Sequence, residues 1–171
     1  WVAMLLWLTV LTSKENRTMA EWKLSQEIIA LSDADTWDDA KQEWDLDEIY
    51  KASRGNPETC LCGHYPILEV CVIRNLKNGE TVVVGNCCVK KFMSEPNRIF
   101  RALDRIEEDY ENPLNADAIY YAYDKEWIDD WQKEFYIDTW RKRKLSEKQM
   151  TKRSEINLQI MKRYDMKRSS L

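Results

Sequence analysis

The sequence predicts an α+β fold that is mainly helical and contains one β-hairpin. Glycine and proline are scarce, at four residues each in a chain of 171, which favours helices joined by short connections. A single pair of segments rich in β-branched residues flanks an Asn-Gly dipeptide, the usual signal of a tight hairpin. All five cysteines and the only histidine lie between positions 60 and 88, on and beside that hairpin.

The chain opens with an apolar stretch over residues 1–11. Such a stretch is too short to span a bilayer, which takes about 20 residues. It also lacks the basic leader and the cleavage motif of a signal peptide. From Met19 the sequence has soluble character, so we expect the folded part to begin near there. Residues 1–18 would then be an upstream extension; the alternative is a short apolar helix that packs on the body or on a partner.

Helical spacing predicts three short helices before the hairpin. The first covers residues 24–31, with apolar positions at Leu24 and Ile28. Thr36 is placed to cap the second helix, which would run through Trp44. Asp45 would cap the third, over residues 46–52. Within this region we expect Trp37, Ala40, Trp44 and Ile49 to face the core.

The hairpin is predicted from residues 67–74 and 81–84, which are rich in β-branched side chains. Asn78-Gly79 supplies the two positive φ angles of a two-residue turn. Lys77 and Glu80 would then face each other across the two strands.

The second half of the chain is expected to be helical. Pro96 suits the first turn of a helix that runs to about Tyr110. Asn115 would cap one long helix that ends near Lys144, and a capping box at 146–149 would open a last helix through about Tyr164. The expected long helix carries one apolar face, formed by Ile119, Tyr123, Trp127, Trp131 and Phe135. We therefore expect a helical domain over residues 19–140 and a basic C-terminal helix over 141–171.

The cysteines and the histidine predict one structural zinc ion. Thiolate and imidazole are the ligands that zinc prefers, and Cys60, Cys62 and His64 precede the hairpin while a cysteine pair follows it. A straight strand would separate positions 60 and 64 by about 13 Å, so the chain must curl around the ion. Gly63 would permit that curl. The site would be treble-clef-like or zinc-ribbon-like, in a reducing, cytoplasmic setting.

The fourth ligand comes from the adjacent pair, where Cys87 and Cys88 are both candidates. The stretches 60–67 and 84–92 resemble small uncharacterised proteins of bacteria and their phages. These share Cys-x-Cys-Gly-His and, after a hairpin, Gly-Asn/Ser-x-Cys-Val/Ile-x-Lys-Phe. The resemblance covers about a fifth of the chain and places the ligand on Cys88; it implies a zinc site and a phage or mobile-element origin, without any reaction. Cys71 lies within a predicted strand and is expected to be a core residue.

Catalytic motifs are not expected in this chain. Catalytic zinc keeps an open coordination position, whereas four protein ligands are available here. With the single histidine assigned to the metal, no Ser-His-Asp or Cys-His pair remains. We therefore predict that the protein is not an enzyme.

Charge is segregated along the chain. Residues 141–168 hold 11 basic and three acidic residues, a net of +8, while the rest holds 15 basic and 27 acidic residues, a net of −12. A basic segment can neutralise phosphates, and Trp140 and Tyr164 could stack on bases. The sequence thus favours a nucleic-acid-binding or regulatory protein. The alternative is a protein-interaction module or inhibitor that binds a host or defence enzyme through the acidic, aromatic surface. No membrane contact is expected. The predicted contacts are Arg141, Lys142, Arg143, Lys144, Lys148, Lys152 and Arg153.

Overall fold

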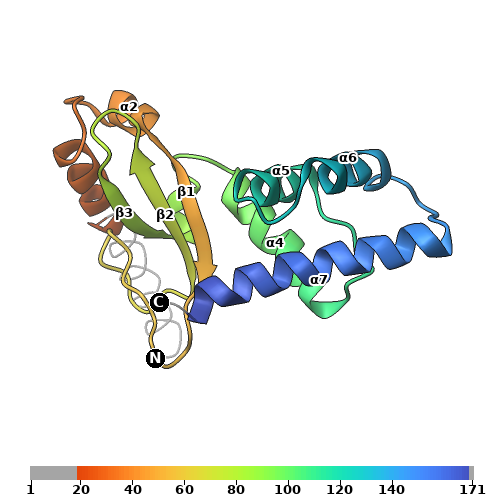
Figure 1. Cartoon of the computed structure of the whole chain (residues 1–171). Helices are drawn as coiled ribbons and strands as arrows, with labels where there is room; N and C mark the ends of the chain where they lie inside the picture. Colours follow the sequence, from red (N-terminus) through yellow and green to blue (C-terminus); the bar gives the residue numbers. More distant parts are fainter. Residues whose placement is uncertain (1–18, 170–171) are drawn as a thin grey trace, which may run out of the picture. The chain divides into compact units, whose positions relative to one another are not determined.

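The computed structural model describes residues 19–169 and confirms the α+β class. The chain divides into two compact units, one ending at Met93 and the other beginning at Ser94 (Figure 1). The predicted leader, residues 1–18, lies outside the described residues. No helix within residues 19–169 is both long and apolar enough to cross a membrane.

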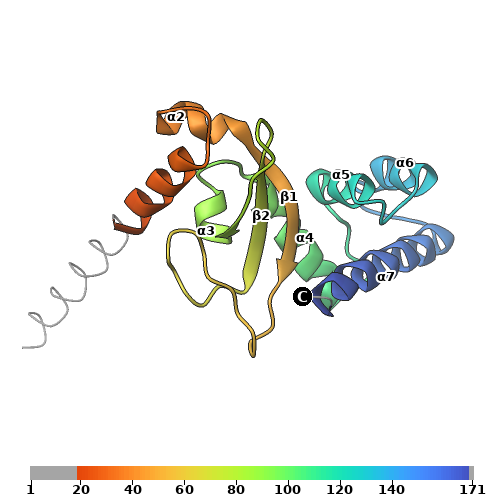
Figure 2. The same cartoon turned by 60° about the vertical axis from the view of Figure 1, so that its left-hand side comes forward.

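The first unit is built around a three-stranded antiparallel sheet with the order β1-β2-β3. Its strands are β1 (Trp44–Lys51), β2 (Glu69–Asn75) and β3 (Thr81–Gly85). Residues 19–30 are helical, and α2 (Trp37–Ala40) leads through a 3₁₀ turn (Lys41–Glu43) into β1. The short helix α3 (Asn86–Val89) follows β3 directly and packs beside β2 and β3 (Figure 2).

Strand β1 corrects the sequence prediction, which placed helices over 36–44 and 46–52. Only α2 and a 3₁₀ turn form before Trp44, and the following residues pair with β2 from Trp44↔Asn75 to Lys51↔Glu69. The free edge of β2 offers a full ladder of backbone hydrogen bonds, which outweighs the weak local preference for helix. The expected inward positions Ala40, Trp44 and Ile49 are buried.

The predicted hairpin forms as β2 and β3, but its turn is longer than expected. Backbone hydrogen bonds join Asn75 to both Glu80 and Gly79, so four residues make the loop, and Gly79 takes a positive φ while Asn78 does not. Lys77 does not face Glu80. Its ammonium lies 2.7 Å from the carboxylate of Glu43, which draws the side chain across to the start of β1.

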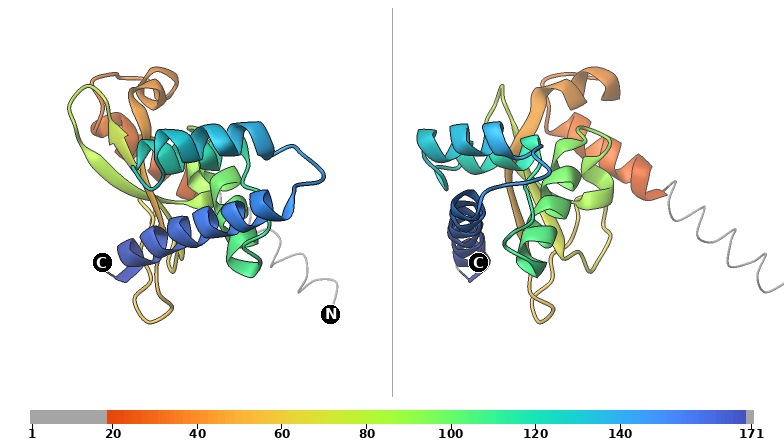
Figure 3. Two further views of the ribbon diagram at one scale, coloured as in Figure 1. Left: turned by 45° about the vertical axis from the view of Figure 1, so that its right-hand side comes forward. Right: turned by 90° about the vertical axis from the view of Figure 1, so that its right-hand side faces the viewer.

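The second unit consists of four helices: α4 (Glu95–Glu108), α5 (Ala116–Asp124), α6 (Asp130–Thr139) and α7 (Glu147–Ser169). Figure 3 shows α5 and α6 lying along one side of α7. The predicted starts are confirmed: Pro96 stands in the first turn of α4, and Asn115 caps α5. The capping box of α7 is present, because Ser146 and Gln149 exchange hydrogen bonds between side chain and backbone.

The prediction of a single long helix from Asn115 to about residue 144 is wrong, because the helix ends after Asp124. Glu126 takes a left-handed φ of 57°, and the amides of Glu126 and Trp127 bond to the carbonyls of Tyr123 and Ala122. This paired bonding is a Schellman motif, which ends a helix. Asp129 then caps α6 with a full capping box.

The division of the chain also differs from the predicted 19–140 and 141–171. Helix α7 is part of the second unit, where Asn157 donates hydrogen bonds to the carbonyls of Tyr110 and Asn112. Its side-chain oxygen accepts a hydrogen bond from the buried Tyr136. The C-terminal helix is therefore a core element of a four-helix unit, not an appendage.

Candidate metal centre

The loop that carries the first two cysteines is closed at its base. Glu58 and Ile67 form an antiparallel bridge with backbone hydrogen bonds of 3.1 and 2.9 Å. Within the loop the amide of Gly63 donates to the carbonyl of Cys60 at 2.7 Å, and the amide of Cys60 donates to the carbonyl of His64 at 2.9 Å. Gly63 has a φ of +88°, which confirms the predicted curl of the chain at this residue.

The third cysteine comes from the opposite side of the hairpin. Cys88 lies on α3, which begins where β3 ends. The loop and β3 are tied together, since the amide of Leu61 donates to the carbonyl of Val83 at 2.9 Å. Gly85 allows this approach: a Cβ there would stand 3.1 Å from the side chain of Ile67. The hairpin therefore brings residues far apart in the sequence to one point.

Three cysteines form a compact cluster at this point. The sulfur atoms of Cys60, Cys62 and Cys88 all lie within 4.8 Å of one another. Cys60 and Cys62 are buried and Cys88 is half-buried. In a tetrahedral zinc site with Zn–S bonds of about 2.3 Å, the sulfurs stand about 3.8 Å apart. The cluster is therefore close to the spacing that one metal ion requires.

Hydrogen bonds to sulfur prepare Cys60 to act as a thiolate. The thiol of Cys88 donates to it, and the amides of Gly85, at 3.3 Å, and Cys62 add two more bonds. Against the effect of burial, these bonds lower the pKa of Cys60 to about 5. The hydrogen bond that the Cys88 thiol donates to Cys60 raises the pKa of Cys88, and burial raises it further. Burial also raises the pKa of Cys62. A metal ion bound by all three sulfurs would displace the protons that Cys62 and Cys88 keep.

The remaining predicted ligand, His64, lies near the cluster but outside it. Its exposed side chain lines the same cavity as the three cysteines, but its ring nitrogens are not among the converging ligand atoms. Its backbone amide donates to the sulfur of Cys62. The structure brings Cys88 to the cluster and leaves Cys87 exposed, as expected from the resemblance. Cys71 is fully buried in β2, where burial raises its pKa to about 12, in keeping with a core residue.

A cavity of about 840 Å³ opens onto the cysteine cluster. Its wall carries polar and charged groups that the sequence analysis had not assigned to the site. Asn86, Lys90 and Lys91 could have been found from their closeness to Cys88 in the sequence, whereas Glu21 and Glu69 come from other segments. Lys91 is paired with Glu21 at 2.8 Å, and Asn86 donates a hydrogen bond to Glu69. Lys90 is exposed on this wall. The cluster is thus reachable from solvent on one side.

The predicted basic contacts divide into two groups. Arg141, Lys142, Arg143 and Lys144 are exposed between α6 and α7, with Arg141 stacked 4.4 Å from the ring centre of Trp140. Lys148 is exposed on α7, whereas Lys152 is half-buried and forms an ion pair with Glu155.

Arg153 corrects the sequence analysis. It is buried at 4% exposure and donates to the carbonyls of Thr139 and Glu111, at 3.0 and 3.4 Å. Tyr164, expected to stack on bases, is also buried. Both side chains therefore lie inside the second unit and not on its surface.

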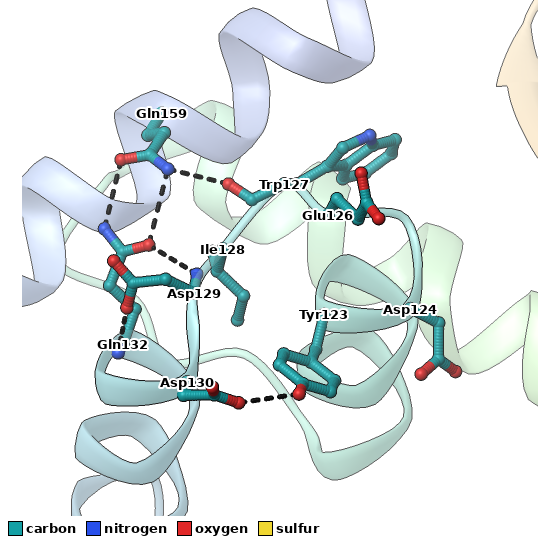
Figure 4. Close-up of a pocket in the computed structure, with 9 residues that line it drawn as sticks. All are labelled: Tyr123, Asp124, Glu126, Trp127, Ile128, Asp129, Asp130, Gln132 and Gln159. Carbon is teal, nitrogen blue, oxygen red and sulfur yellow. Dashed lines mark hydrogen bonds between the residues drawn. The ribbon is translucent and has the colours of Figure 1, made fainter.

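A second cavity, of about 560 Å³, lies in the second unit around the α5–α6 connection. Its polar side chains already have partners: Gln132 and Gln159 bond to each other, and Tyr123 donates to Asp130 at 2.6 Å (Figure 4). The carboxylates of Asp124 and Glu126 point away from those of the α6 terminus. Because these groups do not converge, this cavity shows no ligand constellation.

Comparisons of the chain with protein-family models, with curated proteins and with solved structures gave no match. The function is therefore best sought in the three converging thiols of the first unit. Within the described residues, these side chains lie close enough together to hold a metal ion.

Proposed function

We propose that the first unit binds one structural zinc ion through Cys60, Cys62 and Cys88. The observation that carries this proposal is the convergence of three sulfurs within 4.8 Å, from a closed loop and from a helix on the other side of a hairpin. The sheet of this unit has three strands, which is near the smallest sheet that is stable by itself in water. A metal ion that joins the loop to α3 would supply folding free energy directly.

The ligand chemistry favours zinc over other ions. Thiolates are soft ligands, which excludes magnesium and calcium from this site. Iron–sulfur clusters are usually held by four cysteines, and three converge here. His64 lines the same cavity and is a protein side chain that could take the fourth position. The amide hydrogen bonds to Cys60 and Cys62 support thiolates in the folded state.

The test is the metal content of the freshly purified chain, which should be about one zinc per molecule by elemental analysis. Replacement of Cys62 by Ala should abolish zinc binding and lower the melting temperature. The matched control is Cys71→Val, a buried cysteine outside the cluster, which should keep the metal and change stability only slightly. Folded wild-type protein without metal, or retention of zinc by the Cys62 variant, would contradict the proposal.

A second candidate function is contact with a polyanion through the exposed basic segment, residues 141–144. The observation in its favour is that all four side chains are exposed, next to the half-buried Trp140. Arg141 stacks on that ring, so a cation and an aromatic ring, the two kinds of group that bind single strands, lie side by side. This reading fits a small nucleic-acid-binding protein of a phage or mobile element. A protein-interaction module that uses the acidic remainder of the chain is the alternative.

Replacement of residues 141–144 by Ala separates these two readings. If nucleic acid is the partner, the variant should bind single-stranded DNA or RNA more weakly. Its log affinity should also depend less on log salt, by roughly 0.7 per lost contact. Lys125→Ala, in the same unit but outside the basic segment, is the control and should leave the affinity for nucleic acid unchanged. Arg153 is buried and cannot serve as this control. No binding of nucleic acid by the wild type at low salt would leave the protein-interaction module as the better account.

A further inference from the structure

The cavity beside the cysteine cluster is larger than a closed structural metal site needs. At about 840 Å³ it falls within the range of small-molecule pockets, roughly 300 to 1,000 Å³. Cys60, Cys62 and Cys88 all line it, so a metal ion held by their sulfurs faces the cavity rather than the protein interior. A sealed structural site would instead surround the ion with protein on every side.

His64 is not fixed in the fourth position. Its backbone is held by the hydrogen bond from the amide of Cys60, but its exposed ring lies outside the ligand group. Among residues 19–165, no hydrogen bond or ion pair to the imidazole is found. Metal-ligating histidines almost always donate their other ring N–H to a carboxylate, a carbonyl or water, which fixes the ring. This ring has no such orienting protein partner, so it can enter the position and leave it.

We propose that the fourth position of this metal site is exchangeable and accepts a small thiol that carries a carboxylate. The inference rests on the proposed zinc site. On binding, the S–H proton passes to solvent and the thiolate sulfur forms the bond to the metal. The bond that breaks is the one to His64 or to water. Soft metals prefer thiolate, and a coordinating thiol is deprotonated outright.

The carboxylate is assigned from the charges of the cavity wall. The two acidic groups on this wall already have partners, since Glu21 pairs with Lys91 and Glu69 accepts from Asn86. Lys90 is exposed on the same wall, and no acidic side chain in residues 19–165 pairs with it. Within this part of the chain, the ammonium of Lys90 is therefore free to form an ion pair with an anionic group on a bound ligand.

Cobalt-substituted full-length protein tests the inference, because the absorption bands of cobalt(II) report its ligands directly. Mercaptoacetate should shift these bands saturably, with one molecule bound per chain. Mercaptoethanol, which lacks the carboxylate, should bind about threefold more weakly. Lys90→Gln should abolish this difference between the two thiols, while Lys162→Gln, an exposed lysine of the other unit, should preserve it. His64→Ala should retain cobalt and bind either thiol more tightly, since a competing ligand is removed.

The outcomes separate the inference from the zinc proposal. Wild-type protein that binds neither zinc nor cobalt overturns both. Protein that holds cobalt but whose bands do not respond to excess thiol overturns the exchangeable position alone, as does thiol that strips the cobalt from the chain. Failure of His64→Ala to hold cobalt would also overturn it, because His64 would then be a fixed fourth ligand.

Discussion

At the scale of single residues, Glu43 shows how a buried charge can hold the first unit together. Its side chain is only 3% exposed, and it accepts hydrogen bonds from the side chains of Lys77 and Asn75 and from the amide of Asp33. These partners come from the hairpin turn and from the segment before α2. The bond from Lys77 is the main cause that lowers the pKa of Glu43 to about 2, against the opposing effect of burial.

This shift predicts a specific loss of stability in acid. Because the pKa of Glu43 is lower in the folded state, its contribution is fully present above the ordinary glutamate pKa of 4.5 and is lost as pH falls toward 2. Wild-type protein should therefore lose more stability than Glu43→Gln across this window. Urea unfolding at several pH values measures the difference. Glu27→Gln, an exposed carboxylate of the same unit, should follow the wild type. Parallel curves for wild type and Glu43→Gln would contradict the expectation.

At the scale of elements, the break between α5 and α6 depends on a backbone conformation that glutamate tolerates poorly. Glu126 is exposed and occupies the left-handed position of the Schellman motif, where glycine is the usual residue. The left-handed conformation costs an L-residue roughly 1 to 2 kcal/mol. The motif forms nevertheless, and the buried Trp127 that follows packs against Tyr121. Tertiary packing of this tryptophan therefore offsets the local strain.

Glycine at this position should stabilise the protein. Glu126→Gly removes the steric cost and adds some freedom to the unfolded chain, for a net gain of about 0.5 to 1 kcal/mol in the free energy of unfolding. The matched control is Glu134→Gly, an exposed position inside α6, where the same change should cost about 1 kcal/mol. Chemical denaturation measures both values. Equal losses in the two variants would show that the left-handed conformation at 126 carries no strain.

At the scale of the whole molecule, both compact units have an apolar core, and the cysteine cluster lies in the first. The second unit has a helical core that includes Phe100, Ile119, Tyr136 and Ile160, all nearly inaccessible to solvent. The first unit also buries apolar side chains such as Val70 and Ile73, and in addition its loop and short helix α3 meet at the cysteine cluster. The proposed metal would therefore matter to one unit and not to the other.

Removal of the metal should accordingly act on one unit only. Treatment of the zinc-loaded chain with a strong chelator should speed amide hydrogen exchange at least roughly tenfold in β2, β3 and the loop over residues 58–67. The same treatment should leave α5, α6 and α7 unchanged. Mass spectrometry of peptic fragments reads both units in one experiment, and Cys62→Ala without chelator should reproduce the pattern. Equal acceleration in both units would contradict a division of stability at Met93.

Local signals in the sequence were sufficient for the features that neighbouring residues decide. The caps at Asn115 and Ser146, the hairpin strands and the curl at Gly63 all form as predicted. The candidate ligands were found because cysteine and histidine are scarce and cluster beside a hairpin. The caps and the curl depend on groups within a few residues of one another, and the ligands on either side of the hairpin are linked by a turn that the sequence also marks.

Only the tertiary structure decided the features that depend on distant partners. Residues 46–51 became a strand because β2 offered its edge, and Arg153 became buried because the carbonyls of Thr139 and Glu111 converge on it. Sequence spacing predicted four metal ligands, whereas the fold brings three sulfurs together and leaves the ring of His64 at the cavity. Long-range hydrogen bonding and packing are worth more than local propensity, and a sequence does not display which distant groups will meet.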